Sequence, residues 1–331
     1  MTARVVLLVT SPRLPAGLLT AQAWDAVRRF PVFAGADSEL TTAISVAGDT
    51  RVTVPTPDPA EETLLAAAAE HGTAVWLAGP TGDEDLARRL GLRLAREPGL
   101  AELELMYGSW DPPGARLLDA VEVLDRLASP GGDPWKRQQT HASLARYLLE
   151  ESYEAYDAIV SGDLAALRDE LGDVLLQVVL HARLAEELPD GERWDVDDVA
   201  GGLVAKMIRR NPHVFAGAEV SGVDEIIDNW ERIKAEERAA AGGGLDTPSP
   251  MDGIVLAQPA LSLADKVLQR AGRAGVDVPL PEPDAADDPS ARLGAQLLTL
   301  VAQARADGLD AEGALRRAAL AYADAVRVAA G

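Results

Sequence analysis

The sequence predicts a mainly α-helical protein with a small α/β domain at its N-terminal end. Alanine is abundant while aromatic residues make up only 4% of the 331 residues, which favours helix packing over β-sandwiches. Residues 141–241 place apolar side chains at helical spacing over long stretches, whereas residues 1–110 alternate short apolar runs with helix-like stretches. We therefore expect an α/β domain over residues 1–112, a helical domain over 113–245 and a second helical unit over 246–331.

In the N-terminal part, short apolar runs alternate with longer stretches of helical character. The runs are Val5–Val9, Arg51–Val54 and Ala74–Ala78, and the helical stretches are Leu18–Phe30, Ala60–Glu70 and Asp83–Leu90. Alternation of this kind predicts a small sheet that is at least partly parallel. Loops are expected at Pro55–Pro59 and Gly79–Gly82, because Pro and Gly interrupt both patterns there.

The helical domain is predicted to contain four long helices. They span His141–Val160, Ala165–Glu187, Val196–Arg210 and Val223–Ala241. Asp195 or Asp197 is expected near the start of the third helix, because a carboxylate in that position accepts hydrogen bonds from unpaired backbone N–H groups. Gly242–Gly244 is expected to end the fourth helix, and Asp246–Met251 is expected to form a linker.

Charge and composition exclude several classes of function. The formal net charge is −22, from 53 acidic residues against 31 Lys and Arg, so nucleic acid is not an expected partner. The sequence has no cysteine, which excludes disulfides and thiolate metal sites. The N-terminal apolar run Val5–Val9 is too short for a signal peptide or a membrane span. We expect a soluble cytoplasmic protein without a membrane partner.

Two pairs of acidic residues are the most informative feature of the chain. Glu151 and Glu154 are three residues apart, as are Glu170 and Asp173, and residues three apart share a helix face. A turn at Gly162 separates the pairs, and each acid of one pair lies as far from this glycine as an acid of the other. An antiparallel helix hairpin bent at Gly162 would therefore bring the four carboxylates together at matching heights.

Four carboxylates in one place predict a cation between them. They would repel one another strongly without a positive charge, and oxygen ligands suit hard divalent ions, of which Mg²⁺ is the first candidate and Mn²⁺ the second. The alternative is an ordinary solvated acidic face. Apolar residues such as Leu144 and Ala155 on one helix, and Val174 on the other, place part of the cluster near a core and favour the metal site.

Residues from about 113 to 240 contain an ordered series of short motifs: Pro134–Trp135, Gln139–His141, Tyr147–Glu154, Glu170–Val178, Lys206–Phe215 and Trp230–Lys234. This series resembles the MazG nucleoside triphosphate pyrophosphohydrolases, a branch of the all-α NTP pyrophosphatases. A set of motifs in this order is far more specific than one carboxylate pair. The chain departs from the family pattern at Asp133, where Cys is frequent, at Lys136, where Asp is frequent, and at Asn211, where His is frequent.

The resemblance implies a MazG-type helical bundle that hydrolyses nucleoside triphosphates to monophosphates and pyrophosphate. It also implies a homodimer and a role in removing aberrant nucleotides. A narrower pyrophosphatase, acting on one modified or phosphoribosyl nucleotide, is the alternative within enzymes. A nucleotide-binding regulator without activity is the alternative outside them. The intact set of four acids in this hairpin, next to its loss in the C-terminal copy described below, argues against the regulator.

Each candidate residue has a predicted role. Glu151, Glu154, Glu170 and Asp173 are the predicted metal ligands, and Glu150, rotated about 100° from Glu151 on a helix, is the predicted catalytic base. Glu150 as a plain surface acid is the alternative.

Basic residues must offset the acids so that a triphosphate can bind. Lys206 and Arg210, one helical turn apart, are the first candidates, and Arg168 and Lys234 are weaker ones. Trp135 is a candidate for stacking on the base, with burial in the core as the alternative. His141 stands where a helix begins, so we expect it to cap or pack rather than to catalyse.

The C-terminal part contains a degenerate second copy of the helical unit. Arg292–Leu298 matches Glu170–Leu176, but Arg292 and Ala295 stand where the first copy has Glu170 and Asp173. No stretch resembling the acidic first helix precedes it. We therefore expect this copy to pack without binding metal.

The opening of the chain, Val5–Phe30, faintly resembles the start of tetrapyrrole methylases. The loop that follows its first strand, Thr10–Pro15, lacks the glycines of that family, and the region has about half the length of a methylase. We expect a structural remnant without methyl-transfer activity, with a regulatory role as the alternative.

Overall fold

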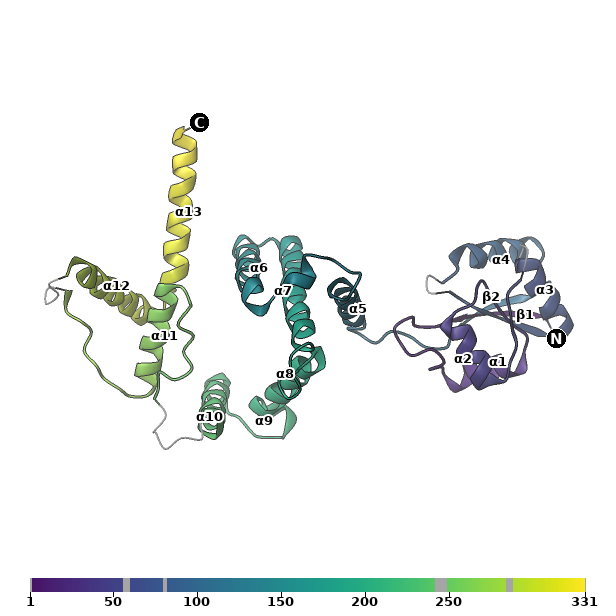
Figure 1. The fold of residues 1–331 in the computed structure, drawn as a ribbon, viewed down its shortest axis with the longest axis horizontal. Coiled ribbons are helices and arrows are strands. Elements are labelled where there is room, and N and C mark those ends of the chain that lie inside the picture. The colour runs from purple at the N-terminus through teal and green to yellow at the C-terminus, as the bar shows by residue number, and fades with distance from the viewer. Residues whose placement is uncertain (1, 56–59, 80–81, 242–248, 284–287, 331) are drawn as a thin grey trace. The chain divides into compact units, whose positions relative to one another are not determined.

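A computed structural model describes residues 2–55, 60–79, 82–241, 249–283 and 288–330 (Figure 1). The chain divides into two compact units, residues 1–204 and 205–331. Helix α8 (Val196–Arg210) crosses the boundary between them. The expected glycine stop at 242–244, part of the linker and part of the loops at 55–59 and 79–82 lie outside the described residues. The domain boundaries at 112/113 and 245/246 stay predictions.

The first unit opens with a five-stranded parallel sheet. The strands are β1 (Arg4–Val9), β2 (Val32–Ala34), β3 (Val52–Thr53), β4 (Thr73–Leu77) and β5 (Glu102–Tyr107), in the order β3-β2-β4-β1-β5. β1 lies between β4 and β5, with Val6 paired to Val75 on one side and Glu104 on the other. Every described pairing is parallel, so the sheet is more regular than the partly parallel one that the alternation predicts.

Four helices cover the two faces of this sheet (Figure 1). They are α1 (Ala21–Arg29), α2 (Glu39–Gly48), α3 (Ala60–His71) and α4 (Glu84–Arg96). Successive residues of a strand point to opposite faces. Val5 and Leu7 of β1 therefore pack in the cluster with α3 and α4, while Val6 and Leu8 pack in the cluster with α1 and α2. This burial of β1 on both faces explains why it reads as a continuous apolar run.

A long helix hairpin follows the α/β part. Helix α6 (His141–Ser161) and helix α7 (Leu164–Ala185) match the predicted bounds within two residues. Gly162 ends α6 with a φ of 76°, a left-handed conformation that glycine adopts without steric cost. Asp163 then caps α7, because its Oδ1 accepts hydrogen bonds at 3.0 Å from the N–H groups of Ala165 and Ala166. Gly162 and Asp163 thus set the reversal of the chain.

Helix α5 (Arg116–Ala128) packs against α7 and closes the base of the hairpin. Ala128, Leu144 and Leu180 form a small buried core there. Arg13, from the loop after β1, donates to both carboxylate oxygens of Asp119 on α5, the closer at 2.6 Å. This ion pair joins the loop to α5 within the first unit.

The second unit is entirely helical in its described residues. Besides the end of α8 it contains α9 (Pro212–Phe215), α10 (Val223–Ala241), α11 (Ala260–Arg273), α12 (Pro289–Ala306) and α13 (Ala311–Ala330). The predicted bounds of the third and fourth long helices, 196–210 and 223–241, are confirmed residue for residue. Asp195 is the acid at the start of α8, since its carboxylate accepts the Asp198 N–H at 2.9 Å. None of the described helices combines the length and apolar character that a membrane span needs.

Candidate metal site

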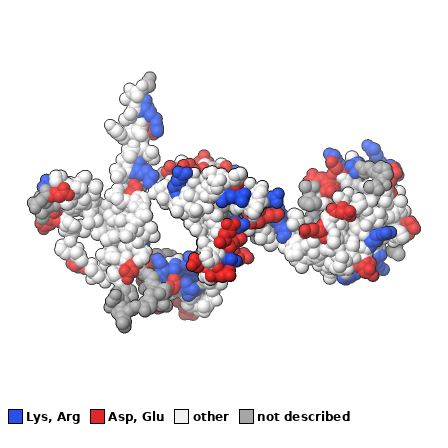
Figure 2. Space-filling view, in the orientation of Figure 1, with Lys and Arg blue, Asp and Glu red and all other residues white. Residues whose placement is uncertain are grey.

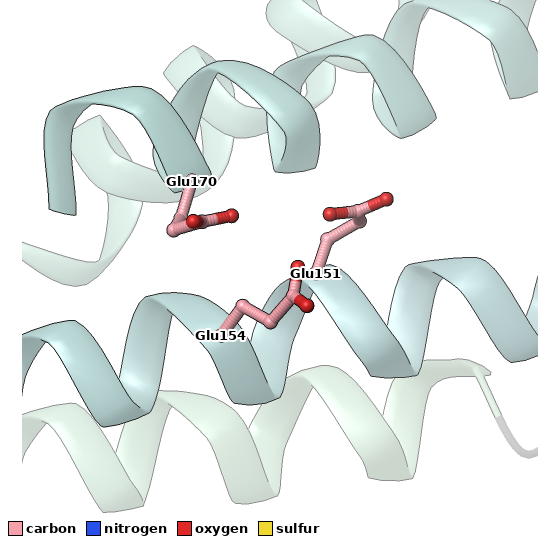
Figure 3. Close-up of side chains that lie close together, drawn as sticks. All are labelled: Glu151, Glu154 and Glu170. Atoms are coloured by element: carbon pink, nitrogen blue, oxygen red, sulfur yellow. The ribbon is translucent and has the colours of Figure 1, made fainter. Parts of the chain in front are cut away.

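Three carboxylates converge between the two helices of the hairpin. Glu151 and Glu154 lie on α6 and Glu170 lies on α7, and each points into the space between the helices (Figure 3). One oxygen of each lies within 4.8 Å of an oxygen of the others. Among the described residues, these three form the group of potential ligands whose spacing suits a metal ion. Three of the four predicted ligands are thus brought together.

The turn at Gly162 places these side chains. Because the chain reverses within Gly162–Asp163, positions at equal distance from the turn meet across the hairpin, and Glu154 comes opposite Glu170. Glu151 lies one turn before Glu154 on the same face of α6. The capping residues therefore determine the register of the site as well as the fold.

Burial and mutual repulsion perturb the acids. The pKa of Glu151 is raised by partial burial first, and then by the charges of Asp173 and Glu154. The pKa of Glu170 is raised by partial burial first, and then by the charges of Glu154 and Asp173. Both shifts have the sign expected for carboxylates that share a site without a compensating cation.

Asp173 and Glu150 lie at the edge of this cluster. Asp173 does not belong to the group of three close oxygens, but its charge contributes to the raised pKa of both Glu151 and Glu170. Glu150 is exposed on α6, and its charge makes a smaller contribution to the pKa of Glu151. Asp173 is thus near enough for its charge to act on both glutamates, and both Asp173 and Glu150 are exposed.

The residues present fit a hard divalent cation. All the converging donors are carboxylate oxygens, which Mg²⁺ and Mn²⁺ prefer over soft metals. The donors come from two helices fixed by a short turn, and their pKa shifts indicate an electrostatic need for positive charge. A cation bound here would reverse the sign of both shifts.

Comparisons with known proteins identify the family. A family model, the MazG nucleotide pyrophosphohydrolase domain, matches residues 139–215, which include α6 and α7. An uncharacterized 26.1 kDa protein in the blaB 3′ region of Streptomyces cacaoi is 46% identical over 246 residues, covering 74% of this chain and 94% of that protein. A Thermotoga maritima protein named nucleoside triphosphate pyrophosphohydrolase/pyrophosphatase MazG is 36% identical over 215 residues, covering 60% of this chain and 80% of that protein.

This chain belongs to the MazG family. A further relative, the Mycolicibacterium smegmatis protein named nucleoside triphosphate pyrophosphohydrolase, is 44% identical over 215 residues. The match covers 65% of this chain and 59% of that protein. The MazG resemblance predicted from the motifs is confirmed, and the mainly helical fold with a small parallel sheet agrees with it.

Of the two basic residues first predicted to bind the phosphates of a MazG substrate, Arg210 has an acidic partner in the structure. In the second unit, the guanidinium of Arg210 pairs with the carboxylate of Glu237, with Nη2 to Oε2 at 2.6 Å, and lies over the Trp230 ring. The two guanidinium groups of Arg209 and Arg210 lower the pKa of Glu237 to about 2. Lys206 is half-buried one turn earlier on α8.

Two weaker candidates also have acidic neighbours. Arg168 is exposed on α7 and pairs with the adjacent Asp169 at 2.8 Å. Lys234 pairs with Glu231 at 3.3 Å in the second unit. A solvated or structural role accounts for the contacts of both.

Aromatic and histidine side chains cluster at the start of α6. Trp135 is 47% exposed and packs edge-on against Tyr147, with ring centres 5.6 Å apart. His141 does not cap the helix, because the Thr140 hydroxyl does so. Instead the His141 ring stacks on those of His181 and Trp194, at 5.0 and 6.0 Å. The expectation that His141 packs is confirmed, and Trp135 is not buried in a core.

Two polar side chains that were not predicted from the sequence follow Asp173 along α7. Gln177 lies one turn after Asp173 and is 4% exposed, and His181 lies one turn further. The Gln177 Oε1 and the His181 Nε2 are buried without a hydrogen-bond partner among the described residues. The signal was the spacing of Glu170, Asp173, Gln177 and His181, which places all four on one stripe of a helix.

The two departures from the MazG pattern have local structural explanations. Asp133 accepts a hydrogen bond from the Trp135 N–H at 2.8 Å and pairs with Lys136 at 3.2 Å, so the exchanged residues form a turn together. Asn211 donates through Nδ2 to the carbonyl of Met207 at 2.7 Å. The bond gives a partner to a backbone carbonyl in the last turn of α8, where such groups lack intrahelical partners.

Proposed function

We propose that this protein hydrolyses nucleoside triphosphates to nucleoside monophosphates and pyrophosphate in a reaction that depends on a divalent cation. The observation that carries the proposal is the convergence of Glu151, Glu154 and Glu170 inside the segment that matches the MazG domain. The M. smegmatis and T. maritima relatives are named for this activity. A polyanionic substrate needs charge neutralisation, which an acidic cluster provides by holding cations.

The proposed ligands of the cation are Glu151, Glu154, Glu170 and Asp173, with Mg²⁺ as the first candidate and Mn²⁺ as the second. When bound, the cation neutralises the charge that develops on the phosphate oxygens. The four acids contribute a set of oxygen donors held on two helices, so little rearrangement is needed before catalysis. The raised pKa values of Glu151 and Glu170 support this assignment, since they identify the groups that gain most from a nearby positive charge.

Glu150 is the proposed catalytic base. It neighbours Glu151 on α6 but is rotated about 100° from it, so it can act on water beside the metal ligands. In this role it orients the attacking water and accepts its proton. The water oxygen forms a bond to phosphorus while a phosphorus–oxygen bond of the α,β-anhydride breaks, which gives monophosphate and pyrophosphate. Its exposure leaves it open to solvent and substrate.

The proposed substrate contacts are Lys206, Arg210, Trp135 and Arg168. Arg210 and Lys206 supply positive charge for the phosphates, and the partner of Arg210 on α10, Glu237, would have to give way to them. Trp135 offers a half-exposed aromatic face for the base. Arg168 is the weakest of the four, because Asp169 already neutralises it.

We also propose a homodimer and a role in removing aberrant nucleotides. Apolar side chains of the α6–α7 hairpin support a partner surface, since Leu149, Ile159 and Leu171 are between 52% and 59% exposed. In this proposal residues 113–245 form the catalytic domain, residues 1–112 form a methylase-like remnant and residues 246–331 form the degenerate repeat.

Pyrophosphate release by the purified full chain tests the proposal. Release from a panel of canonical and damaged nucleoside triphosphates is expected with Mg²⁺ and not with a chelator. The Glu154→Gln variant is expected to be inactive, whereas Asp157→Asn, an exposed acid one turn further along α6, is expected to be active. Equal release by the wild type with chelator present, or by the Glu154→Gln variant, would contradict the metal-dependent mechanism.

A further inference from the structure

A cavity of about 680 Å³ opens in the α/β part, away from the carboxylate cluster. It lies at the carboxyl ends of β1, β2 and β4, where the loop after β1, the start of α2 and the loop after β4 form its walls. Its volume is in the range of small-molecule sites, and the carboxyl edge of a parallel sheet is where such ligands bind. Nothing in the proposed nucleotide hydrolysis uses this cavity.

The chemistry of the lining selects against anions. None of the described residues around the cavity is Lys or Arg. Three acids are among them: Asp37, Glu39 and Asp83. A phosphate group here would meet negative charge without a compensating cation, so neither a triphosphate nor a monophosphate fits.

The three acids differ in availability. Asp83 is already occupied, because its Oδ2 accepts hydrogen bonds from the Trp76 Nε1 at 2.7 Å and from the Gly79 N–H at 3.0 Å. Asp37 and Glu39 follow β2 and are exposed at the rim, and within the described part of the chain no hydrogen bond or ion pair engages their carboxylates. Two acceptors are therefore available at the end of one strand.

The remaining walls suit a flat apolar group. Leu14, Leu18, Leu19 and Leu40 line the cavity, and Ala34 and Leu77 form its floor from the strands. Acids placed after the second strand of a parallel sheet can accept hydrogen bonds from the vicinal hydroxyls of a ribose. The apolar walls would then cover the base.

We propose that this cavity binds an unphosphorylated ribonucleoside, with Asp37 and Glu39 accepting hydrogen bonds from the ribose hydroxyls. The site is separate from the proposed catalytic centre in residues and in charge preference. The cavity favours ligands without phosphate groups, whereas the carboxylate cluster is proposed to act on a substrate that carries three of them. The α/β part would then be a binding module for a nucleoside.

Isothermal titration of the full chain tests this assignment. The probes are adenosine, guanosine, cytidine, uridine, 2′,3′-dideoxyadenosine and AMP, titrated in the presence of a chelator so that the metal site binds phosphate weakly. One ribonucleoside is expected to bind with 1:1 stoichiometry and at least about tenfold more tightly than its dideoxy analogue, because hydrogen bonds to charged acceptors are lost. AMP is expected to bind more weakly than adenosine or not to compete with the bound nucleoside.

Variants locate the site. The Asp37→Asn/Glu39→Gln double variant is expected to lose at least about tenfold in affinity, whereas Asp25→Asn, an exposed acid of α1 that does not line the cavity, is expected to bind as the wild type does. Circular dichroism checks that each variant is folded. As a second measure, nucleoside is expected to shift the amide resonances of residues 35–41.

The assignment is overturned if no ribonucleoside binds at about 1 mM. It is also overturned if AMP displaces the nucleoside with equal affinity, or if the folded double variant binds as tightly as the wild type.

Discussion

Glu154 and Glu170 lie at equal distances from Gly162 along the chain and face each other across the α6–α7 hairpin, with carboxylate oxygens within 4.8 Å. Beside partial burial, the charge of Glu154 raises the pKa of Glu170 and also that of Glu151. A metal-free hairpin therefore holds repelling charges at neutral pH. The same arrangement that weakens the fold without metal creates affinity for a cation, which is the basis of the first two predictions.

We predict that Glu154→Gln abolishes pyrophosphate release and raises the thermal unfolding temperature of the metal-free protein. The substitution removes the charge that raises the pKa of both Glu151 and Glu170, so repulsion in the hairpin falls. Thermal unfolding with a chelator and with Mg²⁺ measures the effect. Mg²⁺ is expected to raise the unfolding temperature of the wild type and to change that of the variant little. A variant with near-wild-type turnover at millimolar Mg²⁺ would remove Glu154 from the site.

We predict that the affinity for Mg²⁺ falls as the pH is lowered, beginning above the usual carboxylate range. A raised pKa means that protons compete with the cation at Glu151 and Glu170 at higher pH than at an ordinary acid. The stability of the metal-free protein is expected to change with pH in the opposite direction and to rise as the pH falls. Because the folded-state pKa lies above the unfolded value of 4.5, these groups favour folding below 4.5, and this contribution is lost as the pH rises through the folded pKa.

Titration of Mg²⁺ binding at several pH values, with unfolding of the metal-free protein over the same range, checks both signs. The control is the Glu151→Gln variant, in which the pH dependence of binding is expected to flatten. A binding constant that does not change between pH 7 and pH 5 would contradict the assignment of these acids as ligands.

The sequence predicted the α6–α7 hairpin and the convergence of three of its acids better than it predicted the α/β part. Helix bounds and three converging acids followed from local signals, namely apolar spacing, Gly162 and Asp163. Strand β2 was missed because three residues give too short a pattern, and α2 was missed because its signal is the Ser38–Thr41 capping box rather than an apolar stripe. The pairing of Arg210 with Glu237 depends on how two helices pack, which no local pattern reports.

The Arg210–Glu237 pair allows binding and folding roles to be separated. We predict that Lys206→Ala and Arg210→Ala each raise KM by about tenfold or more, because each removes a charge-assisted contact worth about 1.5–3 kcal/mol to the phosphates. Glu237→Gln is the matched control. It removes the partner of Arg210 and is expected to lower stability without raising KM.

The pKa of Glu237 gives this pair a pH signature. Its depressed value of about 2 means that it favours folding above the unfolded value of 4.5, and that this contribution is lost as the pH falls through about 2. Steady-state kinetics and acid unfolding of the three variants provide the measurements. Unchanged KM for both basic variants would show that the phosphates bind elsewhere.

We predict that residues 1–114 are not needed for pyrophosphate release. The core beneath the carboxylates consists of Ala128, Leu144 and Leu180, all beyond that range. A chain that begins at Ala115 loses the ion pair between Arg13 and Asp119, and surface ion pairs of this kind contribute little to stability. Arg13→Ala in the full chain is the control for that loss. A shortened chain that is folded by circular dichroism but inactive would show that the α/β part supports the site.

The last prediction concerns the degenerate repeat, where restoring the acids should not restore a metal site. Ala295 on α12 stands where the first copy has Asp173, and it is 5% exposed. The Ala295→Asp substitution is therefore expected to bury a carboxylate and destabilise the second unit by several kcal/mol, about 3–5 for an unpaired buried charge. Arg292→Glu, a change within the same helix, is expected to cost much less.

Testing the two substitutions singly and together distinguishes an effect on packing from an effect on metal binding. Leu293 and Leu300 are more than half exposed on α12, and few charged side chains cover α11–α13 in the view of Figure 2, so this unit presents apolar surface of its own. Mg²⁺ titration of Arg292→Glu/Ala295→Asp is expected to show the stoichiometry of the wild type, because in the described part of the chain α12 packs against α11 and α13, and the acids with metal-binding spacing lie on α6 and α7. Light scattering is expected to show more aggregation for any variant with Ala295→Asp than for Arg292→Glu alone. A second equivalent of bound Mg²⁺ in the double variant would show that α12 retains the geometry of a metal-binding helix, and that the repeat lost its chemistry through two residues only.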